Sequence, residues 1–359
     1  MGGGVVRRTP FIAMAACTMA LVGTGVAAAQ PTTAQMAGQR VMWPVDSTSV
    51  SPWMKAAIRR GEVGSIILFA RNAPNRATLR RLTRQLQAIP RPADVDAPLL
   101  IAVDQEGGLV KRLPWAPPTM SAARMGARLG PAGIRAQGRS TGRALRAAGV
   151  NADLAPVCDL SMPGRDLARD GRAFGASLVG VGAECTAFAK GLADSRVAAS
   201  AKHFPGFGRA KVNTDDAVVR VTASRSTLMR EMKPFRAAVD GGVPMVMVSS
   251  IVFPQLSVRP ALLSPMVVDD LLRDDLGFEG VTITDAIDTP ALRPWGGTRA
   301  ASASAAVAGM DLVIVATTEA EAARAVQGVR GALANGRIRP ADARQSLDRV
   351  LALRRALAR

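Results

Sequence analysis

The chain is poor in the side chains that most often transfer protons. Its 359 residues contain no tyrosine and one histidine, His203. Histidine is the usual proton shuttle near neutral pH. If the protein is an enzyme, His203 therefore either belongs to the site or takes no part in the chemistry. Any other proton transfer must then use aspartate or glutamate, which favours a reaction whose general acid and base are carboxyl groups.

Aromatic residues are also scarce, at 4% of the chain, although the formal net charge is +18. A strong positive charge is typical of nucleic-acid binding. Here the basic residues are scattered along the chain and not gathered in an arm or tract. No stacking aromatics accompany them. We therefore expect no nucleic-acid partner, and a dispersed basic surface would instead favour acidic polymers such as cell-wall material.

The first 29 residues predict an export signal. Arg7 and Arg8 precede an apolar run over 11–29, and three alanines at 27–29 give a small-residue cleavage site before Gln30. The run is long enough to raise the idea of a membrane span. Its small residues and its Ala-x-Ala ending favour a cleaved signal instead.

Two refinements of this signal stay open. Residues 7–11 resemble in part a twin-arginine signal, and the segment ending at Cys17 resembles in part a bacterial lipobox. We expect the domain of residues 30–359 to be exported, and the protein to meet a membrane only if the signal is instead processed at the lipobox and the chain is lipid-anchored at Cys17. Cleavage leaves Cys158 and Cys185, which can either form a disulfide or remain as buried free thiols.

Short hydrophobic runs alternate with longer amphipathic segments over the rest of the chain. Most runs are continuously apolar, as expected for strands buried on both faces. They span 41–44, 64–69, 98–103, 150–156, 198–203, 245–249, 281–284 and 311–315. About eight strand–helix units in roughly 320 residues predict an α/β fold, a single-domain (β/α)8 TIM-type barrel. A doubly wound open sheet is the alternative, but no Gly-x-Gly-x-x-Gly turn supports a dinucleotide fold.

Polar side chains follow the carboxyl ends of most of these strands. Examples are Asp104, the Lys202-His203 pair, and Asp285. In a barrel these ends converge on one face, where the active site lies. A carboxylate such as Asp285 at the barrel mouth suits a nucleophile, or a group that stabilises an oxocarbenium-like transition state.

The same residues carry a family resemblance from about Gly38 to the end of the chain. The motifs that carry it are Ile67-Leu68-Phe69-Ala70-Arg71-Asn72, Val103-Asp104-Gln105-Glu106-Gly107-Gly108, Ala155-Pro156-Val157, Lys202 to Gly208, and Leu276 to Val281 leading into Thr284-Asp285. In this order and spacing the chain resembles glycoside hydrolase family 3, specifically the single-domain β-N-acetylglucosaminidases of bacterial wall recycling. The resemblance implies a barrel, a retaining mechanism, a carbohydrate substrate, and no cofactor or metal ion. We expect the chain to act as a monomer.

The resemblance also implies roles for particular residues. By position, Asp285 matches the family's catalytic nucleophile. The residues that match those holding the terminal sugar are Asp104, Arg112, Arg172, Lys202 and His203. An aspartate accepts hydrogen bonds from paired sugar hydroxyls, and arginine or lysine donates to hydroxyl or acetamido oxygens.

The chain departs from the family in the loop after the Lys-His motif. There the family carries Asp-Ser-His, whose histidine is the general acid/base. Counting without gaps, this triplet falls on Asn213, Thr214 and Asp215. The family's Gly-His-Gly and Gly-Gly-Arg also appear here as Gly206-Phe207-Gly208 and Gly107-Gly108-Leu109.

Two functions remain open at this point. In the first, Asp215 is the acid/base, with a pKa raised by burial or by the Asp285 charge, and Asp216 is the alternative residue. In the second, the loop is degenerate and the protein binds saccharides with little turnover. The nucleophile, the acidic substitution and the sugar-holding set are all present. We therefore predict an exported retaining β-N-acetylhexosaminidase that acts on wall-derived fragments containing N-acetylglucosamine.

Overall fold

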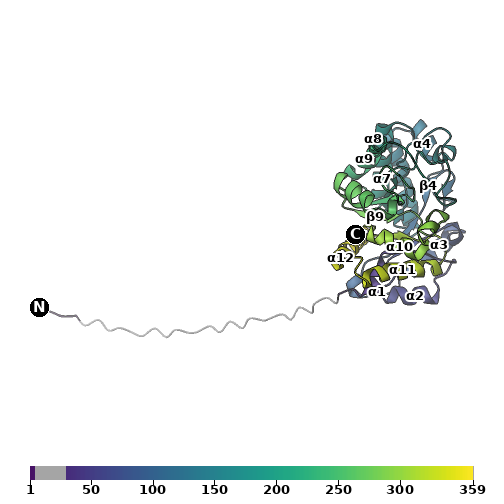
Figure 1. Cartoon of the computed structure of the whole chain (residues 1–359). Helices are drawn as coiled ribbons and strands as arrows, with labels where there is room; N and C mark the ends of the chain where they lie inside the picture. The colour runs from purple at the N-terminus through teal and green to yellow at the C-terminus, as the bar shows by residue number, and fades with distance from the viewer. Residues whose placement is uncertain (5–29, 359) are drawn as a thin grey trace.

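The computed structural model describes residues 1–4 and 30–358 of the chain (Figure 1). Cys17 and nearly all of the predicted export signal lie outside the described residues. Among the described residues, no helix combines the length and hydrophobicity that crossing a bilayer requires.

Eight parallel strands form the centre of the fold, one at each run expected from the sequence. The order in the sheet is β10-β1-β2-β3-β6-β7-β8-β9. The strands are β1 (Val41–Pro44), β2 (Ser65–Ile67), β3 (Leu100–Val103), β6 (Ala152–Asp153), β7 (Ala198–Phe204), β8 (Met245–Val248), β9 (Val281–Thr284) and β10 (Val313–Ile314). A short antiparallel hairpin, β4 (Gln105–Gly107) with β5 (Val110–Lys111), follows β3.

The sheet closes between its first and last strands in sequence order. β1 pairs in parallel with β10, where Val41 faces Val313. On the other side of β10, Leu312 forms a parallel bridge with Ile283 of β9. The backbone N–H of Thr284 also donates to the carbonyl of Leu312 at 3.0 Å. The predicted (β/α)8 barrel is therefore confirmed, and the open-sheet alternative is wrong.

Helices surround the barrel, and many begin at a side chain that caps them. Asn75, Ser177 and Thr318, for example, each accept a hydrogen bond from a backbone N–H in the first turn of the following helix. The α-helices are α1 (Thr33–Gln39), α2 (Pro52–Arg59), α3 (Arg76–Gln87), α4 (Ala122–Arg128), α5 (Pro131–Ala147), α6 (Asp166–Arg169), α7 (Leu178–Ala193), α8 (Arg225–Glu231), α9 (Lys233–Asp240), α10 (Gly297–Val307), α11 (Glu319–Ala334) and α12 (Pro340–Ala356). A π-helix, η4, spans Met266–Asp275.

The core has two layers because successive strand residues face opposite sides of the sheet. In β1, Val41 and Trp43 pack outward with the helices, whereas Met42 packs into the barrel. Inside the barrel, Met42 lies in one buried cluster with Met245, Ile283 and other inward-facing side chains. The interior is thus a packed core, and a site can form only at an end of the barrel.

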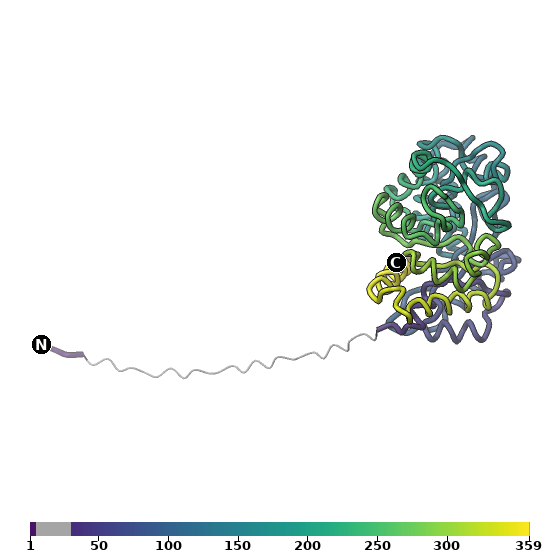
Figure 2. Tube along the Cα trace, viewed as in Figure 1, coloured from purple at the N-terminus to yellow at the C-terminus, as the bar shows by residue number. Residues whose placement is uncertain are grey.

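Helix α12 covers the amino ends of the strands. Its Val350 and Leu353, with Leu357 directly after the helix, join the interior cluster of the barrel. Helix α1, which directly precedes β1, packs against α11 and α12 at this same end. The purple stretch of the folded domain that contains α1 therefore lies close to the yellow C-terminal part (Figure 2).

Cys158 and Cys185 are joined in a disulfide in this structure, with Cα atoms 5.5 Å apart. Cys158 follows the short strand β6, and Cys185 lies on α7. Both are fully buried. Of the two states that the sequence leaves open, the structure has the paired one.

Candidate active site

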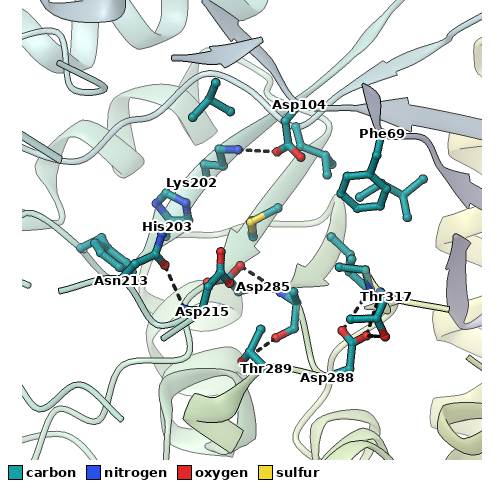
Figure 3. Close-up of a pocket in the computed structure, with 18 of the residues that line it drawn as sticks. Phe69, Asp104, Lys202, His203, Asn213, Asp215, Asp285, Asp288, Thr289 and Thr317 are labelled. Carbon is teal, nitrogen blue, oxygen red and sulfur yellow. Dashed lines mark hydrogen bonds and ion pairs between the residues drawn. The ribbon is translucent and has the colours of Figure 1, made fainter. Parts of the chain in front are cut away.

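A cavity of about 340 Å³ opens at the carboxyl ends of the barrel strands. Inward-facing side chains such as Ile67 and Met247 form its floor. The structure brings all seven predicted site residues to this one cavity: Asp104, Arg112, Arg172, Lys202, His203, Asp215 and Asp285. Figure 3 shows five of them, all but the two arginines. They lie on or after four different strands, β3, β6, β7 and β9, as expected for a barrel mouth.

A buried ion network holds one wall of the cavity. Lys202 Nζ lies 2.8 Å from Asp104 Oδ1 and 2.7 Å from Glu106 Oε1. Arg172 binds Glu106 with two parallel hydrogen bonds of 2.9 and 2.8 Å. Arg112 approaches the other oxygen of Asp104 at 3.6 Å. The bidentate geometry fixes Arg172 in the plane of the Glu106 carboxylate.

The charges of this network set its protonation states. Burial by itself would raise the pKa of Glu106, but the positive charges of Arg172 and Lys202 outweigh burial and hold that pKa well below its usual range. Burial would lower the pKa of Lys202, and Asp104 and Glu106 reverse this, so the pKa of Lys202 is raised. The network is therefore ionised at neutral pH, with fixed donors and acceptors for a polar ligand.

The β4–β5 hairpin positions Glu106. Gln105 Nε2 donates to three backbone carbonyls of the following loop, and the Gln105 backbone N–H donates to Asp153 Oδ1 at 2.9 Å. Gly107 has a φ of 96°, and a Cβ there would collide with the Met120 carbonyl. Only glycine allows this tight turn without strain, and the turn directs Glu106 toward Arg172 and Lys202.

His203 is held by a buried carboxylate. Its Nδ1 lies 2.7 Å from Asp159 Oδ2, and its backbone N–H donates to the same oxygen at 2.9 Å. The other oxygen of Asp159 accepts the backbone N–H of Phe207 at 2.5 Å. Phe207 packs against the imidazole, with ring centroids 5.1 Å apart. Asp159 therefore fixes both the ring and the loop that begins here.

That loop carries Asn213, Thr214 and Asp215 to the opposite wall, beside Asp285. The Thr214 hydroxyl donates to Asp285 Oδ2 at 3.3 Å, and the Ala286 N–H donates to Asp285 Oδ1 at 2.9 Å. Asn213 Oδ1 accepts the backbone N–H of Asp215 at 3.0 Å. Thr214 is buried, which anchors the loop against the end of β9.

The carboxyl group of Asp215 faces the cavity (Figure 3). Burial and, next, the negative charge of Asp285 raise the pKa of Asp215 to about 6. The residue is nevertheless exposed to solvent, and water there moderates the effect of burial. Asp216, the alternative acid/base, is also exposed, but it does not line the cavity.

A further carboxylate, Asp288, lies at the rim of the cavity. Asp288 accepts the backbone N–H groups of Ala316 and Thr317 at 3.0 and 2.9 Å, and also the Thr317 hydroxyl. It therefore ties the segment after β9 to the segment after β10. Within residues 1–4 and 30–358, no three histidine, cysteine or acidic side chains gather as metal ligands.

Residues 34–353 match the family model for the glycosyl hydrolase family 3 N-terminal domain. The chain belongs to glycosyl hydrolase family 3. This confirms the resemblance seen in the motifs, and it makes the chain a glycosidase.

Relatives of this family 3 chain agree with that conclusion. A protein of Arthroderma benhamiae named as an uncharacterized secreted glycosyl hydrolase is 33% identical, over 90% of this chain and 94% of its own. A β-hexosaminidase of Stenotrophomonas maltophilia is 31% identical, over 79% of this chain and 86% of its own.

Solved structures of other family 3 members have the same fold. A β-N-acetylglucosaminidase from a Paenibacillus species superposes with a TM-score of 0.87 at 33% identity. That match covers 91% of this chain, which spans 63% of the Paenibacillus chain. A β-N-acetylhexosaminidase from Beutenbergia cavernae superposes with a TM-score of 0.83 at 31% identity, over 90% of this chain and 98% of its own.

Sequence reasoning missed several residues of this family 3 site. Glu106, Asp159, Thr214 and Asp288 each bind a predicted site residue or hold a wall of the cavity. The sequence does point to Glu106, because it lies two positions after Asp104 in the motif Val103 to Gly108. Leu109 replaces the arginine of the family's Gly-Gly-Arg and is 74% exposed, so it points to solvent.

Proposed function

We propose that the protein is an exported retaining β-N-acetylhexosaminidase that releases terminal β-linked N-acetylglucosamine from saccharides of cell-wall origin. Family membership supports the reaction class, and the names of the relatives support the sugar. The fungal relative is named as secreted, and the paired cysteines are typical of proteins from oxidising compartments. Export is either free or through a lipid anchor at Cys17.

The observation that carries the proposal is the pairing of Asp285 with the loop of Asp215 across one cavity. Asp285 attacks the anomeric carbon while the glycosidic C–O bond breaks, and Asp215 gives its proton to the leaving oxygen. Water then attacks the glycosyl–Asp285 ester as Asp215 takes the water proton back, releasing the sugar and restoring both carboxyl groups. A pKa of about 6 for Asp215 suits a group that must act first as acid and then as base.

The sugar is held on the opposite side by the ion network. Asp104 accepts hydrogen bonds from the ring hydroxyls, and His203 can accept or donate. Arg112, Arg172 and Lys202 donate hydrogen bonds to oxygens of the sugar. All of these groups come from one chain, which supports a monomer as the working unit. No cofactor takes part in the proposed steps.

Labelling of the covalent intermediate tests this proposal. A slow 2-fluoro or 5-fluoro sugar should trap the glycosyl-enzyme, and peptide mass spectrometry should find the label on Asp285. Label on another residue, in an enzyme with proven turnover, would remove Asp285 from the mechanism.

A second candidate function is saccharide binding with little turnover. It is favoured by the partial exposure of Asp215, whose carboxylate accepts no hydrogen bond from any described residue. Calorimetry that detects sugar binding, together with no release of aryl alcohol from an aryl N-acetylglucosaminide, would establish this function and exclude the first.

A further inference from the structure

A second cavity of about 340 Å³ lies away from the active site, at the amino end of the barrel strands. Arg40 directly precedes β1, Gly309 lies just before β10, and α12 supplies the outer wall. The cavity shares no lining residue with the catalytic one. Whatever it holds therefore does not take part in the proposed reaction.

The lining of this cavity is strongly basic. Five arginines and two aspartates line it: Arg40, Arg273, Arg337, Arg339 and Arg349 against Asp269 and Asp342. Asp311 is not part of the lining, but it pairs with two of these arginines, so the whole group carries an excess of two positive charges. Asp311 is already occupied, because it binds Arg273 at 2.6 Å and Arg349 at 2.8 Å. Asp342 binds Arg339 at 2.6 Å. This leaves the charge of Arg40 and Arg337 without an ion-pair partner among the described residues.

Arg40 is the most informative of these side chains. It is 2% exposed, and its Nη2 donates to the carbonyls of Ala306 and Met310 at 3.2 and 2.7 Å. Its Nε and Nη1 have no hydrogen-bond partner among the residues that the structure describes. Burial lowers the pKa of Arg40 to about 10, so it remains charged at neutral pH. A buried cation with two unused donors is costly unless something accepts from them.

A second buried donor lines the same cavity. The hydroxyl of Ser346, on α12, is also buried and has no partner within the described part of the chain. Helix α12 begins at Pro340 without a side-chain cap, and the positive end of its dipole lies at this cavity. Three independent features therefore favour negative charge in the same space.

We propose that this cavity is a binding site for a phosphate group, as free phosphate or as a phosphate monoester. A tetrahedral oxyanion can accept from Arg40, Ser346 and Arg337 at once, because its oxygens point in different directions. Binding there would stabilise the closed end of the barrel, where Arg40 joins the start of β1 to the end of α10.

Titration calorimetry with inorganic phosphate, in chloride buffer of constant ionic strength, tests the site on the full chain. We expect one site in the wild-type protein, and affinity about tenfold weaker in Arg337→Ala and in Ser346→Ala. Arg81→Ala, on the exposed face of α3, removes the same charge elsewhere and should leave phosphate affinity unchanged. Arg40 is not varied, because it also holds two backbone carbonyls.

Phosphate could instead enter the catalytic cavity, and Arg112→Ala separates the two locations. Retained affinity in Arg112→Ala supports the proposed site, whereas affinity lost there and kept in Arg337→Ala would overturn it. Absence of any phosphate site in the wild-type protein would also overturn it. A parallel titration with glycerol 3-phosphate shows which of the two phosphate sources the site accepts.

Discussion

The hydroxyl of Thr214 donates a hydrogen bond to Oδ2 of Asp285. This contact joins the loop after β7 to the carboxylate after β9, which are separated by 71 positions in the chain. It connects the proposed nucleophile to the neighbour of the proposed acid/base. The position of one carboxylate therefore depends on the other through Thr214.

Replacing Thr214 should lower turnover. Thr214→Val keeps the shape and removes the donor, so Asp285 loses a charge-assisted hydrogen bond and the loop loses its anchor. We expect kcat/KM to fall by about 10- to 150-fold, since one such bond contributes roughly 1.5–3 kcal/mol. Thr214→Ser restores the donor and should recover most of the activity. Equal losses in both variants would show that only packing matters there.

Asp215→Asn should slow hydrolysis according to the leaving group. For an aryl glycoside with a poor leaving group we expect a loss of about 10²–10⁴-fold in kcat/KM, because general acid catalysis is removed. A dinitrophenyl glycoside needs little protonation and should lose much less. Asp216→Asn changes an exposed carboxylate outside the cavity and serves as the control. A similar loss for both leaving groups would contradict the role of Asp215.

The pH dependence of activity should follow Asp215. The first step requires its protonated form, and burial together with Asp285 raises its pKa to about 6. We therefore expect kcat/KM to decline as the pH rises above about 6, since the free enzyme then loses the acid. Measured on the dinitrophenyl substrate, Asp215→Asn should show no such decline. A decline that persists in this variant would assign it to another group.

The buried network predicts a large effect on stability. Lys202→Met leaves the carboxylates of Asp104 and Glu106 without their shared cation, and the free energy of unfolding should fall by about 3–5 kcal/mol. Arg60→Met breaks the partly exposed pair with Glu62 at 2.6 Å and should cost less than about 1 kcal/mol. Urea unfolding of both variants measures the difference. Comparable losses would mean that the buried network adds no stability beyond a surface pair.

The barrel could be predicted from the sequence because its strands are buried on both faces. Segments such as 98–103 and 245–248 are continuously apolar, and each is followed by a polar residue. Parallel strands bring those polar residues to one end of the barrel, irrespective of the sequence and length of the loops. The family motifs then add Arg112 and Arg172, which lie on loops and have no periodic signal of their own.

Other features depend on contacts between distant segments, which spacing does not reveal. Glu106 lies in a buried strand of a short hairpin, and its partner Arg172 is 66 positions away. The pairing of Cys158 with Cys185 needs α7 to pack beside the end of β6. The burial of Arg40 depends on α10, 266 positions later in the chain. In each case the side chain alone looks like an ordinary polar or surface residue.

Asp153 gives a pH dependence of stability that is separate from activity. It is fully buried behind the network, and its Oδ2 has no partner among the described residues. Burial raises its pKa from 3.8 to about 8. Folding therefore favours the protonated form, and this contribution to stability is complete below pH 3.8 and is lost as the pH rises toward 8.

Asp153→Asn should remove that dependence, because asparagine keeps the shape and never ionises. We expect the wild-type protein to lose more stability than the variant between pH 5 and pH 8, so that the variant gains relative to wild type at the higher pH. Thermal or urea unfolding at both pH values measures this difference. Asp240→Asn, at an exposed aspartate of α9, corrects for the loss of one negative charge. If wild type and Asp153→Asn respond to pH alike, Asp153 is already ionised in the folded protein, and the cations of the network must then balance three buried carboxylates rather than two.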